Sequence, residues 1–329
     1  MNLLSSMQIP ILLFTLLGLV FAGIIEKPKE SDTGGQAGFP VNPEKRWPRS
    51  IAFEVIIPWC FKDAASEQAI GPAIDRGWET WTRTLGLASP QNGHNLHFKR
   101  WMPYNTNQYP YCHDANGHWN DRMPADAVMV SYTHDFGGFQ ARATVGYNPE
   151  NRPGRHQIIM SQAHNMDWTA AHEIGHVFGL LHEHQRPDRD FFIHFDCRNV
   201  QGYQQALAQA QADGYTNEQL CEQPGVALRY GWLGSEFIKF KPLSADIITP
   251  YDINSIMHYD CRFGADHARW GHDPTNPTLY PLFTFNPERT MSFLLPLKGG
   301  RPYPHFDISA GDAATIRAMY PFYPTHLKG

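Results

Sequence analysis

Two histidines separated by three residues, His172 and His176, can lie on one face of a helix and bind a metal ion together. Side chains four positions apart on an α-helix lie one above the other. Glu173 is rotated about 100° around the helix, where it can reach a water at the metal without being a ligand. Gly179 can adopt the left-handed backbone conformation that ends a helix, and His182 follows that turn. Three histidines leave one coordination position open, which is typical of a catalytic zinc site.

The wider spacing decides between a metal site and an ordinary helix. His-Glu-x-x-His alone is short enough to arise by chance, and its alternative interpretation is an amphipathic helix with hydrogen-bonded histidines. The longer pattern, which includes Gly179 and His182, is much harder to obtain by accident. It predicts one Zn²⁺ per chain, with His172, His176 and His182 as ligands. The nearby His164 is not needed for this set and is assigned to a loop.

A charged run and a second motif extend the pattern. His182 is followed by EHQRPDRD at residues 183–190, and SIMHY stands at residues 255–259. In this order and with the zinc pattern, the two segments resemble the astacin family of zinc metalloproteases. The resemblance implies that Met257 lies beneath the metal as packing and that Tyr259 lies at its side.

The resemblance also implies a role for each site residue. Glu173 would be the general base of peptide hydrolysis. Tyr259 would stabilise the oxyanion, and its hydroxyl would be a further zinc ligand that swings away when substrate binds. Glu183 would have a structural role through a buried contact. The run at 183–190 would form an ionic network that fixes the third-ligand loop; the alternative is a solvated charged turn.

The fold that the resemblance implies is α+β and metzincin-like. An N-terminal lobe would hold a twisted, mostly parallel sheet and two helices, the second carrying the zinc ligands; an irregular C-terminal lobe would end in one long helix. Apolar and β-branched runs predict strands at 52–61, 96–101, 127–132, 144–146 and 157–161. Helical periodicity predicts helices at 63–85, 201–223 and 308–320, the last capped by Ser309.

Several local features of these elements stay open. Gly71-Pro72 either kinks the first helix or marks its start. Asp167 or Thr169 caps the zinc helix. In the resembling family, the strand before that helix is a sheet edge that runs antiparallel to bound substrate, so residues 157–161 are expected to lie at an edge; an ordinary edge strand fits the sequence equally well. Residues 261–300 are expected to be irregular.

The N-terminus predicts export. An apolar run from Ile9 to Ala22 is too short for a comfortable membrane span and ends in small residues suited to signal peptidase, although a membrane anchor is the alternative. We expect a signal peptide at 1–22, a leader or short propeptide at 23–46, and an astacin-like catalytic domain at 47–329 with lobes at about 47–180 and 181–329. Astacin-type propeptides plug the zinc site with an aspartate, and Asp32 is the only aspartate in this leader.

Composition narrows the partners and the compartment. The 329 residues carry a formal charge of −5 without a Lys/Arg run, which argues against nucleic acid. Five cysteines, none in CxxC spacing, predict disulfides after secretion and at least one thiol without an internal partner. Cys197 and Cys221 flank the 201–223 segment and can staple it, but sequence leaves the connectivity open.

Together these features predict a secreted, extracellular, zinc-dependent metalloendopeptidase. It would bind protein or peptide substrates in extended form, act as a monomer, and contact neither nucleic acid nor, once the signal is removed, membrane. One alternative is a non-catalytic secreted binding protein that keeps the zinc-protease fold. Another is a different metzincin branch, against which residues 183–190 argue. Substrate preference stays open.

Overall fold

A computed structural model describes residues 40–41, 45–51, 53–134, 140–163, 165–240, 246–247, 249–296 and 306–322. The expected signal peptide at 1–22, nearly all of the leader at 23–46, and His164 lie outside these ranges. The proposed domain boundaries therefore stay predictions.

The main sheet has five strands, and all but one of its neighbouring pairs are parallel. Their order in space is β3-β2-β4-β6-β5. Strand β2 is buried along almost its whole length, as expected when both faces of a parallel sheet are covered. The strands are β2 (Val55–Phe61), β3 (Leu96–Arg100), β4 (Val128–Tyr132), β5 (Ala141–Ala143) and β6 (Gln157–Met160). The α+β fold with a mostly parallel sheet is confirmed.

The antiparallel strand corrects two expectations. The strand predicted at 144–146 is wrong, because β5 ends at Ala143 and the chain then leaves the sheet. Gly146 adopts a φ of 58°, and its amide donates to the His176 carbonyl at 2.8 Å. Because β5 pairs with β6, the strand directly before the zinc helix is not the sheet edge; β5 is.

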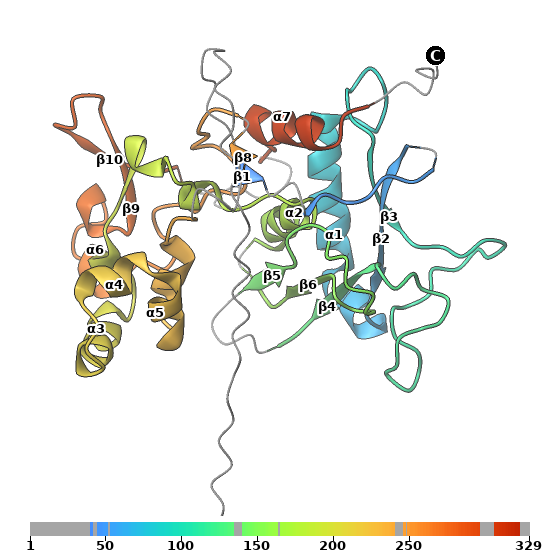
Figure 1. Cartoon of the computed structure of the whole chain (residues 1–329), viewed down its shortest axis with the longest axis horizontal. Helices are drawn as coiled ribbons and strands as arrows, with labels where there is room; N and C mark the ends of the chain where they lie inside the picture. The colour runs from blue at the N-terminus through green and yellow to red at the C-terminus, as the bar shows by residue number, and fades with distance from the viewer. Residues whose placement is uncertain are drawn as a thin grey trace, which may run out of the picture. The chain divides into compact units, whose positions relative to one another are not determined.

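Two helices pack side by side against this sheet, as Figure 1 shows for α1 (Ala64–Leu85) and α2 (Met166–Val177). Helix α1 is capped by Asp63 and passes through Pro72 without a break, so Gly71-Pro72 does not mark its start. The Trp81 indole of α1 donates to the Ala171 carbonyl of α2 at 2.8 Å. The helices also cross closely at Gly77, where a Cβ would lie 2.8 Å from the Ala171 nitrogen, so both contacts fix α2 against α1.

The cap of α2 differs from the expectation. Neither Asp167 nor Thr169 caps the helix; the side chain of Asn165 accepts the Trp168 amide at 3.2 Å. The expected caps lie inside the helix, because α2 begins one residue before Asp167.

The segment that was predicted as one helix at 201–223 packs in a hydrophobic cluster separate from the core around the main sheet. The structure has two short helices there, α3 (Tyr203–Ala212) and α4 (Asn217–Glu222), and a third, α5 (Pro224–Arg229), directly after it; Figure 1 shows them close to β9. Gly214 adopts a φ of 85° just after α3, and Pro224 is the first residue of α5. The turn at Gly214 thus divides the segment, and a proline starts a further helix just beyond it.

Residues 261–300 are more regular than expected. Within the described part of this range lie α6 (His267–Trp270), β9 (Leu282–Phe285) and β10 (Ser292–Leu294), and the antiparallel order β10-β9-β7 includes β7 (Ile193–Phe195). A further pair joins β1 (Pro40–Val41) to β8 (Asp246–Ile247). Short 3₁₀ turns are η2 (Glu183–Gln185), η3 (Arg189–Phe191), η4 (Cys197–Asn199), η5 (Leu233–Phe237) and η7 (Pro277–Leu279).

The last helix, α7 (Ala310–Met319), is capped by Ser309 as predicted. Its residues Ile316 and Met319 belong to the same hydrophobic core as β2, α1 and α2. The helix that ends the described chain therefore packs against the elements that carry the zinc pattern.

Two disulfides are present, Cys60–Cys112 and Cys197–Cys221, so the expected staple is confirmed. Cys261 is a buried free thiol. Within the described ranges, no helix has both the length and the apolar character that a bilayer crossing requires.

Candidate metal centre

Three histidines meet at the end of α2. Their nitrogens lie within 4.8 Å of one another, and the side chains are buried. The Nε2 atom of His182 lies 3.2 Å from Nε2 of His172 and 3.1 Å from Nε2 of His176. The structure thus brings together the three residues predicted as ligands.

The Nδ1 atom of each ring lies close to an acceptor of its own, and this determines which ring nitrogen carries the proton. Nδ1 of His172 lies 2.8 Å from the Ile256 carbonyl, and Nδ1 of His176 lies 2.8 Å from the Leu180 carbonyl. Nδ1 of His182 lies 2.9 Å from Oε1 of Gln185. Each Nδ1–H therefore donates outward, and three Nε2 lone pairs face one another, an arrangement that repels unless a cation lies between them.

Electrostatics and geometry both fit zinc at this point. Burial lowers the pKa of His172 to about 3 and of His176 to about 4, and it lowers the pKa of His182 well below its usual value. The rings are therefore neutral ligands at neutral pH. Zinc–nitrogen bonds of about 2.0–2.1 Å in a tetrahedron place neighbouring nitrogens about 3.3 Å apart, close to the spacing seen here. The residues fit one zinc ion with a coordination position left open.

The turn after α2 delivers the third ligand. Gly179 adopts a φ of 103°, as expected, and its amide donates to the His176 carbonyl at 2.8 Å. The Leu180 amide donates to the Gly175 carbonyl at 3.1 Å, which closes the turn. The conformation therefore favours glycine, and a Cβ here would in addition lie 2.9 Å from Cε of Met319, which would have to shift.

Glu173 is buried on α2, and its Oε2 atom has no partner among the described residues. Burial, together with the nearby charge of Glu236, raises its pKa to about 8. A dication at the histidines would oppose this rise. The free carboxylate oxygen suits a group that exchanges a proton with a water or a substrate, and this role stays a prediction.

Met257 lies beneath α2 as the resemblance implies. A Cβ at Gly175 would lie 2.5 Å from Sδ of Met257, so the methionine packs directly against the helix between the two histidines. The Glu183 amide donates to the Met257 carbonyl at 3.0 Å, which joins this turn to the third-ligand loop.

Tyr259 lies beside the histidines. Its ring centroid is 4.5 Å from that of His182 and 4.1 Å from that of His184. Burial raises the pKa of its hydroxyl well above the usual value, and the charges of Glu236 and Glu173 add to the rise. The hydroxyl is therefore a proton-bearing donor; its part in the reaction stays a prediction.

The charged run after His182 forms a buried network, as predicted. Arg186 donates to Glu183 at 2.9 Å and to Asp188 at 2.7 Å, and the side chains of Arg186 and Glu183 are fully buried. Glu183 also accepts the Asp252 amide at 2.6 Å. Arg189 donates to the carbonyl of His184 at 2.8 Å. These bonds hold the third-ligand loop against the segment that leads to Met257.

Asp312 is a site-supporting residue that sequence reasoning missed. Its carboxylate accepts the Ser255 hydroxyl at 2.6 Å and the Ile256 amide at 2.8 Å, while the Ile256 carbonyl accepts from the ligand His172. Ser309 and Asp312 form a capping box at the start of α7. The spacing S-x-x-D was visible in the sequence, but it indicates a cap and not a contact more than fifty residues away.

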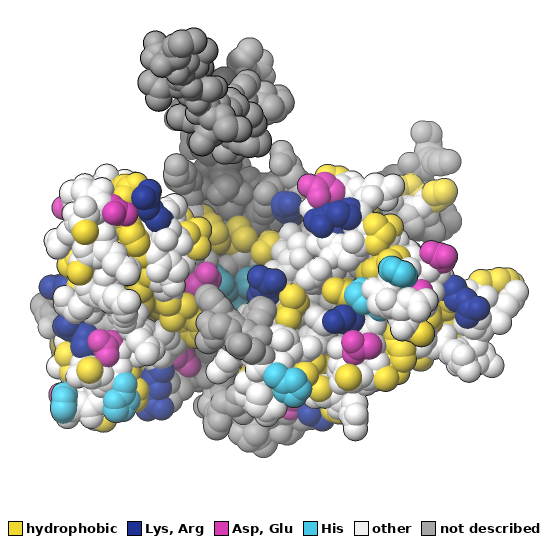
Figure 2. Space-filling model, turned by 90° about the horizontal axis from the view of Figure 1, so that it is seen from below, with side chains coloured by type: hydrophobic (Ala, Val, Ile, Leu, Met, Phe, Trp, Pro, Cys, Tyr) yellow, Lys and Arg dark blue, Asp and Glu magenta, His cyan; other side chains and the backbone are white. Residues whose placement is uncertain are grey.

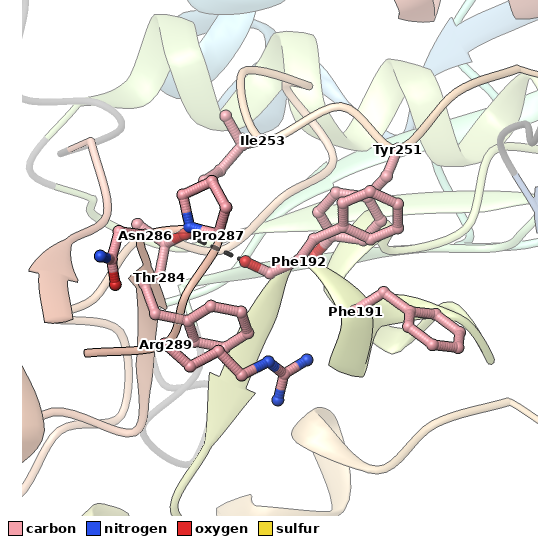
Figure 3. A pocket seen from close by; sticks show the side chains of 9 residues that line it. Phe191, Phe192, Tyr251, Ile253, Thr284, Asn286, Pro287 and Arg289 are labelled. Carbon is pink, nitrogen blue, oxygen red and sulfur yellow. Dashed lines mark hydrogen bonds between the residues drawn. The ribbon is translucent and has the colours of Figure 1, made fainter. Parts of the chain in front are cut away.

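A separate hollow lies away from the histidines (Figure 3). It has a volume of about 520 Å³. A hydrogen bond from Thr284 to the Phe192 carbonyl at 3.0 Å closes one side. Its lining is Phe191, Phe192, Tyr251, Ile253, Thr284, Phe285, Asn286, Pro287 and Arg289. None of the predicted site residues lines it.

On the face drawn in Figure 2, basic and acidic side chains are interspersed, so neither sign of charge dominates it. This pattern does not favour a polyanionic ligand on that face.

Known proteins are similar to the part of the chain that contains the three histidines. The model of the Astacin peptidase family matches residues 130–231. This range includes His172, Glu173, His176 and His182 but ends before Tyr259. The assignment of Tyr259 therefore rests on its motif and its position beside the histidines.

Two relatives from Caenorhabditis elegans match part of the chain. Zinc metalloproteinase nas-12 is 30% identical over 107 residues, which cover 32% of this chain and 20% of the relative. Zinc metalloproteinase nas-9 is 29% identical over 152 residues, covering 46% of this chain and 20% of the relative. The chain thus spans about one fifth of the length of these relatives.

A solved structure is also similar: high choriolytic enzyme 1, a hatching enzyme zinc-protease from Oryzias latipes. The TM-score is 0.43 at 17% sequence identity, over 84% of this chain and 94% of that one.

Proposed function

We propose that this chain, whose residues 130–231 match the model of the Astacin peptidase family, is a zinc-dependent metalloendopeptidase of that family. The observation that carries the proposal is the convergence of three neutral Nε2 atoms whose Nδ1–H groups all donate outward. Such a site binds zinc and leaves a position for a reactant.

Each site residue has a defined part in hydrolysis. Zinc, when bound, lowers the pKa of a water and polarises the scissile carbonyl. Glu173 takes a proton from the attacking water while a C–O bond forms, and it then gives this proton to the leaving amine while the C–N bond breaks. The Tyr259 hydroxyl donates to the oxygen on which negative charge develops. Its raised pKa keeps that proton in place at neutral pH.

Substrate would bind in extended form along the sheet edge. Strand β5 is an edge strand and contacts α2, the helix with two of the ligands. An extended peptide can pair with such an edge through main-chain hydrogen bonds, whatever its side chains. We place the substrate along Ala141–Ala143 and not along β6, which is already paired on both sides.

The cellular setting is also part of the proposal. We infer export through the signal peptide at 1–22, removal of a leader at 23–46, and action of a monomeric catalytic domain at 47–329 outside the cell. Two disulfides support an oxidising compartment.

The test is cleavage of casein by the purified full chain, with zinc and with a chelator. We expect cleavage with zinc, its loss after chelation, and its return when zinc is added back. Glu173→Gln should keep zinc and lose cleavage, while His118→Ala, a change at an exposed surface histidine, should keep both. A zinc-loaded wild type that binds casein without cutting it would instead support the non-catalytic alternative.

A further inference from the structure

The turn η5 and the residue after it accept hydrogen bonds through their main-chain carbonyls from side chains of the third-ligand loop. Nε2 of His184 lies 2.9 Å from the Glu236 carbonyl, and Nε2 of Gln185 donates to the Ile238 carbonyl at 3.0 Å. His184 and Gln185 lie two and three residues after the ligand His182, and Gln185 is the side chain that holds the His182 ring. These bonds fix the position of residue 236 relative to the metal ligands.

The ring packing places the same turn beside Tyr259. The Phe237 ring centroid lies 5.8 Å from that of Tyr259, and Tyr259 stacks on His184 at 4.1 Å. The Glu236 carboxylate is close enough to raise the pKa of both Glu173 and Tyr259, adding to the larger effect of their burial. The main-chain contact of Glu236 with His184 and the packing of Phe237 on Tyr259 thus place residue 236 beside the two groups assigned to the reaction.

The carboxylate of Glu236 has no hydrogen-bond or ion-pair partner among the residues that the structure describes. The basic side chains of the neighbouring segments are already engaged. Arg186 pairs with Glu183 and Asp188, and Lys239 pairs with Asp190. Arg189 donates to main-chain carbonyls.

An uncompensated carboxylate is costly when it is withdrawn from water, and Glu236 is only partly exposed. Burial also raises the pKa of Glu236, because withdrawal from water disfavours the charged form of its carboxyl group. A cation brought by a ligand would remove this cost, whereas an acidic ligand would add a second like charge.

We propose that Glu236 is a specificity-determining residue that receives a lysine or arginine side chain of the peptide, next to the scissile bond. The inference rests on the proposed function, because it assigns the substrate class of the same site. An ammonium or guanidinium group supplies the donors that the carboxylate lacks, and charge-assisted bonds of this kind are among the strongest in proteins.

The first experiment compares cleavage of otherwise identical peptides that carry Lys, Gln or Glu at each position around the cut. We expect one position at which wild type prefers Lys over Gln by about tenfold to hundredfold in kcat/KM, the range expected for a hydrogen bond to a charged group. Glu236→Gln should reduce this ratio to about one, and Glu236→Lys should favour the Glu peptide. The control Glu222→Gln removes the same charge from an exposed position on α4 and should keep the wild-type ratio.

A different result would overturn the assignment. If Glu236→Gln lowers kcat/KM for the Lys and Gln peptides by the same factor, the residue acts through Glu173 and not on substrate. If the wild-type ratio is one at every position, Glu236 reads no basic side chain.

A binding experiment separates this inference from the proposed function. Zinc-loaded Glu173→Gln protein is titrated with the same Lys and Gln peptides, and Glu173→Gln/Glu236→Gln serves as its pair. Tighter binding of the Lys peptide that depends on Glu236 supports the inference even if wild type cuts nothing, in which case only the peptidase proposal fails. Equal binding of both peptides overturns the inference even if casein is cleaved.

Discussion

The Asp312 carboxylate accepts the Ile256 amide at 2.8 Å, and through that peptide unit the last helix reaches the metal centre. The Ile256 carbonyl in turn accepts from Nδ1 of His172 at 2.8 Å. Outer partners of this kind fix the tautomer and the orientation of a ligand ring. Asp312 thus orients a ligand that precedes it by 140 positions in the sequence.

Replacement of Asp312 by Asn should change how stability depends on pH. Burial raises the pKa of Asp312 from 3.8 to about 6, so the folded state binds the proton more tightly than the unfolded state. The resulting stabilisation is fully present below pH 3.8 and is lost as pH rises through about 6; it amounts to on the order of 3 kcal/mol. Urea unfolding of metal-free protein between pH 4 and pH 7 measures it. Over this interval, wild type should lose most of this stabilisation, whereas Asp312→Asn should not lose it; parallel curves would contradict the assignment.

Gly175→Ala should disturb the metal centre, because it adds a methyl group where α2 packs on Met257. Its Cβ would lie 2.5 Å from Sδ of Met257 and 3.1 Å from Cζ2 of Trp81, both buried. Overpacking of this kind costs about 1–3 kcal/mol. We expect a lower free energy of unfolding and weaker zinc binding for Gly175→Ala, measured by denaturation and metal competition.

Gly71→Ala is the matched control for that substitution. Gly71 lies inside α1, and its added Cβ would have ordinary contacts at 3.7 Å. Alanine is the better helix former by up to about 1 kcal/mol, so this variant should be as stable as wild type or more so. Equal effects at both glycines would show that the Met257 contact is not the cause.

Loss of His182 should remove most of the metal. Two histidines on α2 would remain, but zinc would lose a ligand that lies 3.1 Å and 3.2 Å from their Nε2 atoms. We expect His182→Ala to bind zinc at least about a hundredfold more weakly, while His118→Ala keeps one zinc per chain. Metal analysis after gel filtration measures both; full occupancy of His182→Ala would require a different third ligand.

The sequence predicts the centre of the site well because its spacing is local. His172 and His176 share one helix, and Gly179 signals the turn that brings His182 to them. The contacts that hold these groups in place depend on chain segments that meet only in the fold. Ile256 lies in the SIMHY segment and Asp312 in a helix cap, but neither pattern predicts that these two residues bond to each other or that Ile256 bonds to His172.

Short strands and helix caps were predicted less well, because their positions also depend on contacts that form only in the fold. Strand β5 has only three residues, Ala-Arg-Ala, and its place is set by pairing with β6 and not by an apolar pattern. Asn165 caps α2 because the chain enters the helix there, although Asp167 and Thr169 are also good caps. No local pattern around Glu236 predicts that η5 bonds to the third-ligand loop.

Removal of the Tyr259 hydroxyl should lower turnover more than substrate binding. In Tyr259→Phe the ring still packs against His182, His184 and Phe263, so folding and zinc content should match wild type. A donor to the developing oxyanion acts only in the transition state, and loss of one such donor costs about 10²–10³ in kcat. We expect kcat to fall by about this factor while KM changes little. Tyr230→Phe removes an exposed hydroxyl that bonds Asp213, so its kcat should stay at the wild-type value. If Tyr259→Phe also keeps wild-type kcat, the oxyanion must take its proton donor from another group, and Tyr259 serves only to pack the two histidine rings.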